Sequence, residues 1–347
     1  MARPRWQSLA LWPWWPLSVL SSDKSFADNP LLGSPLLNRH GLHAWRTATA
    51  HALTERRRAR LQQLIDPAER ADFERDGYIV RRNVLPAADF ERLRADVLGH
   101  AAPAREMLQG HTITRRIAVD TALRRAAPEL ARFLDSPLWQ GPTRHIAGYD
   151  APPWTYVQTI LSHTRDAAPD PQTDLHADTF HPTMKAWYFL TDVAADEGPF
   201  CYVPGSHRLT PERLAWEARR SQQAADLTDR YSARGSPRIG VGELAGLGLP
   251  GPQLLAVPAN TLVVADTFGF HARGPSLRPS VRIEIWGYDR RNPFLPWTTD
   301  LALQGLGLMA RRPELYWRMQ DWSEQLGGRR GPWRPAGVIC PDAPSWA

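Results

Sequence analysis

Three runs in the chain have the apolar and polar pattern of β-strands. Residues 261–265 are β-branched and apolar, which predicts a buried strand. Residues 281–286 alternate, so that Arg282 and Glu284 share one face while two isoleucines share the other. A further strand is predicted at 154–161. These runs predict a β-rich core.

Helical patterns flank these strands. Residues 67–74 form a helix start, with Asp66 as the N-cap and Pro67 at the first helical position. Residues 88–98 repeat apolar side chains at helical spacing and are expected to lie against the barrel. The Gly- and Pro-rich residues 235–252 predict a long loop over the mouth of an active site. Further helices are predicted at 45–65, 128–134 and 211–231.

Three side chains are candidate metal ligands: the pair His176 and Asp178, and the distant His271. Residues two apart on a strand point to the same side, so the pair can reach one ion. Two imidazoles and a carboxylate on one face of Fe(II) leave three positions open, enough for a bidentate 2-oxo acid and O2. Arg282 follows His271 by eleven positions, and its planar fork suits a carboxylate. The alternative for each histidine is an ordinary packed or solvated residue. The ligand pair, the distant histidine, the arginine after it and the strand-like surroundings together favour the metal site.

Three motifs surround the ligand pair: Leu175–Pro182, Lys185–Val193 and Glu197–Arg208. Together with Gly77–Val80, they resemble the phytanoyl-CoA dioxygenase family over roughly residues 73–289. The most specific parts are the ligand pair, the Pro-Gly-Ser-His turn after it, and the spacing between the distal histidine and the arginine.

The resemblance implies a mainly β fold with flanking helices, namely a double-stranded β-helix of the jelly-roll or cupin type with N-terminal helices. It also implies non-haem Fe(II), 2-oxoglutarate as cosubstrate, and O2. His176, Asp178 and His271 match the metal ligands at the catalytic centre, and Arg282 matches the arginine that binds the cosubstrate.

Three further residues receive weaker assignments. Trp187 matches an aromatic side chain that lines the pocket in the family, and plain core packing is its alternative. Gln158 matches a polar cosubstrate contact, and an outward-facing strand position is its alternative. Lys185 lies in the short segment between Asp178 and Trp187. It is a candidate contact for an anionic ligand, although we favour a solvent-facing lysine there.

The open metal positions predict a dioxygenase that hydroxylates a C–H bond of a small-molecule or lipid-like substrate and releases succinate and CO2. Asp178 favours hydroxylation over halogenation, because a halide takes the position only where the carboxylate is missing. One alternative is a metal-dependent hydrolase or isomerase built on the same barrel with zinc, which would not need Arg282. Another is a catalytically silent barrel used as a binding module. The fold alone does not select the substrate.

Length and composition are consistent with one enzyme domain that has an extension at each end. The chain has 347 residues, of which 43% are hydrophobic, enough for one sizeable core. Its two cysteines, Cys201 and Cys340, allow at most one disulfide, which favours the cytoplasm. We predict a Trp- and Arg-rich extension at 1–66, an oxygenase domain at 67–295, and a tail at 296–347 that packs on the domain as irregular structure and short helices.

The chain is basic, with a formal net charge of +6. No nucleic-acid module accompanies this charge, so no nucleic-acid partner is predicted. A solvated helix face is favoured for the densest basic cluster over an anionic substrate or acidic lipids. The cluster is Arg56, Arg57, Arg58 and Arg60.

Tryptophans gather near the start of the chain, in an apolar stretch that ends at Leu20. The stretch is too short and too rich in proline to span a bilayer. Because tryptophan favours membrane interfaces, peripheral contact with the inner membrane surface is one prediction. We favour an arm that packs on the protein itself. The tryptophans are Trp6, Trp12, Trp14 and Trp15.

Overall fold

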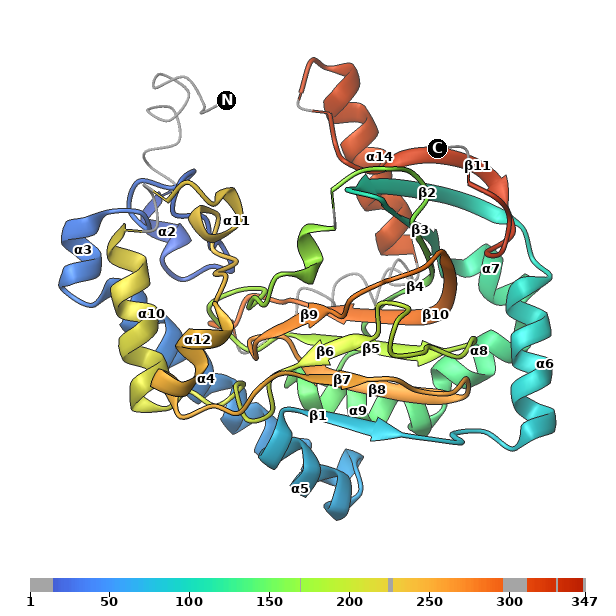
Figure 1. Cartoon of the computed structure of the whole chain (residues 1–347), viewed down its shortest axis with the longest axis horizontal. Coiled ribbons are helices and arrows are strands. Elements are labelled where there is room, and N and C mark those ends of the chain that lie inside the picture. The colour runs from blue at the N-terminus through green and yellow to red at the C-terminus, as the bar shows by residue number, and fades with distance from the viewer. Residues whose placement is uncertain (1–14, 169, 224–226, 296–310, 329, 346–347) are drawn as a thin grey trace.

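The computed structural model describes residues 15–168, 170–223, 227–295, 311–328 and 330–345. An antiparallel sheet of eight strands, in the order β1-β8-β5-β10-β4-β3-β2-β11, forms its centre, and a sheet of three strands, β7-β6-β9, accompanies it (Figure 1). The strands are β1 (Tyr78–Arg81), β2 (Ala102–Gln109), β3 (Thr112–Ala118), β4 (Trp154–Ser162), β5 (Met184–Phe189), β6 (Phe200–Tyr202), β7 (Gln253–Leu255), β8 (Thr261–Asp266), β9 (His271–Arg273), β10 (Ser280–Asp289) and β11 (Arg334–Ile339).

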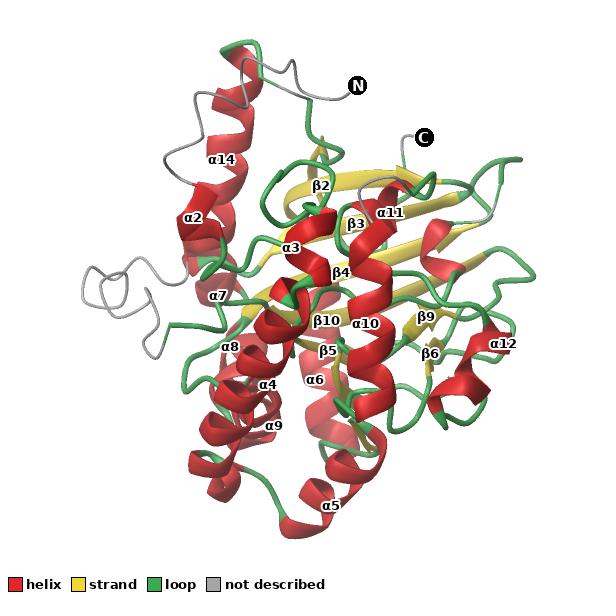
Figure 2. Ribbon diagram, turned by 90° about the vertical axis from the view of Figure 1, so that its left-hand side faces the viewer, coloured by secondary structure: helices red, strands yellow, loops and turns green. Residues whose placement is uncertain are grey.

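Helices surround the sheets, mostly on one side (Figure 2). They are α2 (Trp15–Ser18), α3 (Pro35–Arg39), α4 (Leu42–Arg60), η2 (Gln62–Leu64), α5 (Pro67–Asp76), α6 (Ala87–Leu98), α7 (Thr121–Ala126), α8 (Pro128–Asp135), α9 (Pro137–Ala147), η3 (Pro171–Thr173), α10 (Pro211–Gln223), α11 (Arg230–Ala233), α12 (Val241–Leu244), η5 (Ala245–Leu247) and α14 (Arg312–Gln325). The predicted start of α5 is confirmed, because the Asp66 side chain accepts a hydrogen bond from Ala68 N at 2.8 Å.

The two faces of the large sheet bury different side chains. Ile283 and Ile285 of β10 pack into a core with Trp139 of α9. On the opposite face, Trp187 of β5 lies 4.4 Å from Phe200 of β6, measured between ring centroids, so this core fills the space between the two sheets. The alternation predicted from the sequence is confirmed, and the two facing antiparallel sheets form the predicted double-stranded β-helix.

The first described helices pack against an insertion from the middle of the chain. Helices α3 and α4 lie beside α10 at the left of Figure 1. His43 of α4 and Glu217 of α10 are both buried, with His43 Nε2 and Glu217 Oε2 separated by 3.1 Å. Asn38 of α3 donates to Ser221 O at 3.0 Å. The N-terminal segment is therefore part of the folded body.

The predicted basic helix face is only partly solvated. Arg56 and Arg60 of α4 are exposed, but Arg58 is 4% exposed, and its Nη2 atom lies 2.8 Å from Asp266 Oδ2 at the end of β8. The expectation of a solvated cluster is wrong for Arg58. A buried carboxylate at the end of a distant strand provides its partner.

Two other expectations are corrected. Residues 235–252 include the short helices α12 and η5, which pack near Trp216 and Phe270, and none of residues 235–252 lines the cavity described below. In the tail, α14 is long and β11 pairs with β2 along the edge of the large sheet, where irregular structure was expected. An open sheet edge presents unpaired backbone groups, which explains why the tail adds a strand there.

Within the described ranges, no helix is both long and apolar enough to cross a bilayer. Trp15 begins α2. Trp6, Trp12 and Trp14 lie outside the described residues, so the prediction of membrane contact through them stays a prediction.

Four buried histidines have a pKa below the ordinary value of 6.5, mainly because burial penalises the charged ring. The unfolded chain therefore binds more protons below that pH, and stability that is full above pH 6.5 is lost as pH falls. We expect the free energy of unfolding, measured in urea, to fall by several kcal/mol between pH 7 and pH 5. An unchanged value over this interval would contradict the burial of these rings. They are His51, His145, His181 and His207.

Candidate metal centre

His176 and His271 are placed side by side by a direct backbone pairing. His176 N donates to His271 O at 3.0 Å, and His271 N donates to His176 O at 2.9 Å. Their rings consequently lie 4.5 Å apart between centroids. His271 is the first residue of β9, whereas His176 forms only an isolated bridge. The expectation that the His176–Asp178 pair lies on a strand is wrong; Asp178 is held in a loop, where its N donates to Thr267 O at 2.9 Å.

The nitrogen atoms of both imidazoles are oriented for metal binding. Nδ1 of His176 donates to Asp174 O at 2.7 Å, and Nδ1 of His271 donates to Gly269 O at 2.9 Å. Because a carbonyl can only accept, both Nε2 atoms keep a lone pair. They lie 3.8 Å and 3.7 Å from Asp178 Oδ1.

This donor set fits a metal ion. One atom from each of His176, Asp178 and His271 lies within 4.8 Å of the other two. His271 Nε2 is buried and has no hydrogen-bond partner, which is costly unless a ligand takes its lone pair. Burial lowers the pKa of His176 well below its ordinary value and that of His271 to about 4, so both rings are neutral near pH 7, as metal binding requires.

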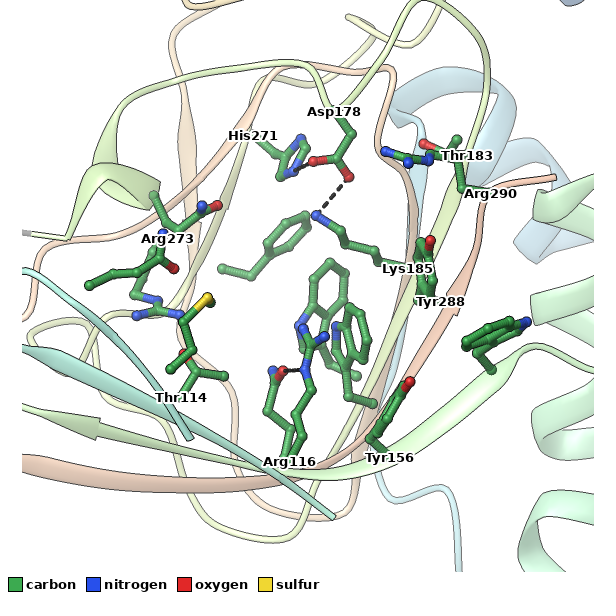
Figure 3. A pocket seen from close by; sticks show the side chains of 18 of the residues that line it. Thr114, Arg116, Tyr156, Asp178, Thr183, Lys185, His271, Arg273, Tyr288 and Arg290 are labelled. Atoms are coloured by element: carbon green, nitrogen blue, oxygen red, sulfur yellow. Dashed lines mark hydrogen bonds and ion pairs between the residues drawn. The ribbon is translucent and has the colours of Figure 1, made fainter. Parts of the chain in front are cut away.

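Lys185 holds the second carboxylate oxygen. Its Nζ lies 2.6 Å from Asp178 Oδ2, opposite the oxygen that faces the two histidines (Figure 3). Burial by itself would raise the pKa of Asp178, but the charge of Lys185 holds it well below its ordinary value. The expectation of a solvent-facing Lys185 is wrong, because the side chain points into the cavity beside the ligand set.

Replacing Lys185 by methionine should weaken metal binding. Without the ammonium group, Asp178 loses the contact that fixes its orientation, and losing such an outer partner typically costs about 10–100-fold in metal affinity. Titration with Co(II), followed by visible absorption, measures this change. Lys185→Arg keeps the charge and should retain most of the affinity. Equal affinities for the wild type and Lys185→Met would contradict the orienting role.

A cavity of about 500 Å³ extends from these ligands across the face of the large sheet. Arg282, Gln158 and Trp187 all line it, so the structure brings together all six site residues predicted from the sequence. Trp187 also packs on Phe200, so it both lines the cavity and belongs to the core. An outward-facing Gln158 is excluded, because this side chain is 4% exposed and faces the cavity.

Arg282 already has an anionic neighbour. Its Nε lies 2.9 Å from Oε2 of the fully buried Glu284, and its Nη1 donates to Gly198 O. Gln158 donates to the other oxygen of Glu284 at 2.6 Å and accepts from Arg116 Nε at 2.9 Å. The sequence placed Arg282 and Glu284 on one face, and the structure makes them a pair. Among the described residues, Arg282 Nη2 has no hydrogen-bond partner and remains available to a ligand.

Several cavity residues were missed. The alternation that includes Arg282 continues along β10 to Trp286 and Tyr288, and then to Arg290 just past the end of the strand, and this signal alone would have found them. No comparable signal marked the others, which come from distant segments. They include Lys24, Arg116, Tyr316, Trp317 and Trp333.

Two facing antiparallel sheets with a candidate His, Asp, His ligand set are typical of iron- and 2-oxoglutarate-dependent oxygenase-type enzymes. Residues 73–239 match the family model described as phytanoyl-CoA dioxygenase (PhyH). This match confirms the resemblance predicted from the motifs. His176 and Asp178 lie inside the match, whereas His271 and Arg282 lie beyond its end.

Solved structures with a similar arrangement include three enzymes. The 2-oxoglutarate-dependent epimerase SnoN from nogalamycin biosynthesis is 20% identical, with 64% of this chain and 83% of that chain covered and a TM-score of 0.43. The carbocyclase SnoK from the same biosynthesis is 21% identical, with 65% and 83% covered and a TM-score of 0.42. HygX from Streptomyces hygroscopicus, solved with nickel, 2-oxoglutarate and hygromycin B, is 17% identical, with 65% and 87% covered and a TM-score of 0.40. No curated protein sequence matches the chain.

Proposed function

We propose that this protein is a non-haem Fe(II)- and 2-oxoglutarate-dependent dioxygenase that hydroxylates a C–H bond of a small-molecule or lipid-like substrate. The observation that carries the proposal is the convergence of two oriented Nε2 atoms and one carboxylate oxygen at the end of a cavity. When bound there, iron and 2-oxoglutarate would supply the activation of O2 and the oxidation of the substrate, with release of succinate and CO2.

His176, Asp178 and His271 would hold the metal. Backbone carbonyls fix both imidazoles and Lys185 fixes the carboxylate, so the three ligands need little rearrangement on binding. Three protein ligands leave open positions on an octahedral ion, as a bidentate cosubstrate and O2 require.

Arg282 would bind the distal carboxylate of 2-oxoglutarate through Nη2, while Glu284 holds the guanidinium in place. Gln158 belongs to the same network and would fix the position of Glu284. Trp187 would provide a rigid apolar wall beside the cosubstrate. These roles favour the dioxygenase over a zinc hydrolase, because a hydrolase has no use for a carboxylate-binding arginine across the cavity.

The class of reaction is tested in two steps. Anaerobic addition of Fe(II) and 2-oxoglutarate should give a weak visible charge-transfer band, which a zinc hydrolase or a silent barrel would not give. Release of succinate is then screened with the iron-loaded protein against acyl-CoAs, free fatty acids, lipids, amino acids and aromatic acids. Absence of the band together with hydrolysis of an ester or amide would favour the zinc enzyme.

A further inference from the structure

The protein has only two lysines among its 42 lysine and arginine residues, and both lie at the metal site. Lys185 pairs with the Asp178 side chain at 2.6 Å. Lys24, which is far away in the sequence, lines the same cavity and donates from Nζ to the Asp178 backbone carbonyl. The basic surface of this protein is thus built from arginine, whereas both ammonium groups are directed to one position in its interior.

The segment that carries Lys24 is held firmly in place. Arg46 of α4 is 1% exposed and donates to four backbone carbonyls of this segment. The distances are 3.4 Å to Ser18 O, 2.9 Å to Val19 O, 3.0 Å to Ser21 O and 2.7 Å to Asp23 O. On the other side of Lys24, Gly235 approaches so closely that a Cβ atom there would lie 2.0 Å from Lys24 O. This segment lies outside the part of the chain that matches the family model, residues 73–239.

Positive charge at this end of the cavity is not balanced. Lys185 shares its charge with Asp178, but the acceptor of Lys24 is a neutral carbonyl. Arg290 is exposed, lines the same cavity (Figure 3) and forms no ion pair with any described residue. A bound anion would balance the charge of these two side chains.

An aromatic surface begins directly beside these cations. Tyr288 is the cross-strand neighbour of Lys185, and its ring stacks with that of Trp286 at 5.5 Å and 8° between planes. Trp154 of β4 contacts Tyr288 edge to face at 6.4 Å. Flat rings arranged in this way suit a planar or apolar body more than a flexible polar one.

We propose that Lys24 and Arg290 bind the anionic group of the substrate, and that Trp154, Trp286 and Tyr288 hold its planar apolar body beside the metal. The substrate class is accordingly an organic carboxylate or phosphate with an aromatic or otherwise flat carbon skeleton. This inference rests on the proposed function for the reaction itself.

The anion site is separate from the expected cosubstrate site. Arg282 lies on β10 and Arg290 directly follows its end, eight positions further on, which corresponds to roughly 27 Å of extended chain. One anion therefore does not satisfy both arginines. The N-terminal segment would thus decide which substrate enters, since it supplies Lys24.

Binding of 2-naphthoate to the full-length protein, without added metal, tests the anion site by calorimetry. We expect 2-naphthoate to bind at least about tenfold more tightly than its neutral analogue 2-naphthalenemethanol. Lys24→Met should weaken the binding of 2-naphthoate about tenfold, and Arg290→Met about threefold, because Arg290 is more exposed and better screened. Lys24→Arg keeps the charge and should retain most of the affinity.

Arg132→Met on α8 is the matched control, because this arginine is exposed, does not line the cavity and should leave binding unchanged. Near-UV circular dichroism shows whether each variant keeps its tertiary structure. Failure of 2-naphthoate to bind, equal affinities for acid and alcohol, or binding that depends on Arg282 and not on Lys24 would each overturn the inference. Loss of the iron and 2-oxoglutarate band with 2-naphthoate binding intact would overturn only the proposed function.

Discussion

Replacing Asp178 by alanine should abolish the charge-transfer band of the Fe(II) and 2-oxoglutarate complex. The substitution removes the one carboxylate ligand and leaves Lys185 unpaired beside two histidines, so positive charge replaces negative charge at the metal position. Changes to outer partners of metal ligands already cost about 10–100-fold, so we expect 2-oxoglutarate turnover to fall by about 100-fold or more. Anaerobic difference spectra and release of succinate measure the two effects.

Asp196→Ala is the control for this substitution. Asp196 is partly exposed, forms an ion pair with Arg278 at 2.9 Å and does not line the cavity. It should leave the band and the turnover unchanged. A wild-type band in Asp178→Ala would mean that the carboxylate does not bind the metal, and the proposed ligand set would have to be abandoned.

Replacing Arg58 by methionine should destabilise the whole protein by about 3–5 kcal/mol. Asp266 has no exposed surface, so removal of Arg58 leaves a buried carboxylate without its cation. Asp266 also accepts hydrogen bonds from Thr183 N at 3.1 Å and Phe268 N at 2.9 Å, close in sequence to His271. Urea unfolding at pH 7.5 measures the loss, and metal affinity is expected to decrease with it.

Two further variants separate charge from packing. Arg56→Met removes an exposed arginine of the same helix and should change stability by no more than about 0.5 kcal/mol. The double variant Arg58→Met with Asp266→Asn should recover part of the loss, because an asparagine oxygen still accepts both backbone hydrogen bonds and carries no charge. If the double variant were as unstable as Arg58→Met, the unpaired charge would not be the cause.

Part of the site could be predicted because its signals are local. The alternation in 281–286 depends only on the two-residue period of a strand, and it placed Arg282 and Glu284 toward the interior correctly. Asp66 and Pro67 likewise fix the start of α5 through backbone geometry and one hydrogen bond. Such features depend only on neighbouring residues, so they are the same in any fold in which the strand or helix forms.

Other features depend on segments that meet only after folding. Nothing near Lys24 in the sequence indicates that it reaches Asp178, because the contact is set by Arg46 and by the close approach of Gly235. The burial of Arg58 depends in the same way on the end of β8, and β11 forms because β2 offers it a free edge. From the sequence, an arginine within a basic cluster is predicted to be solvated, because the acidic partner that buries it lies far away in the chain.

The sequence by itself determined the β-rich core, the ends of several helices and the identity of the three candidate ligands, because periodicity, caps and motif spacing are properties of short stretches of chain. Only the tertiary structure decided that each imidazole turns its Nε2 atom, and not its Nδ1 atom, toward the carboxylate of Asp178. It also decided that Glu284 pairs with Arg282 and that Lys24 contacts Asp178. These arrangements are fixed by burial, where an unpaired charge or polar atom is costly and any partner must come from a remote segment.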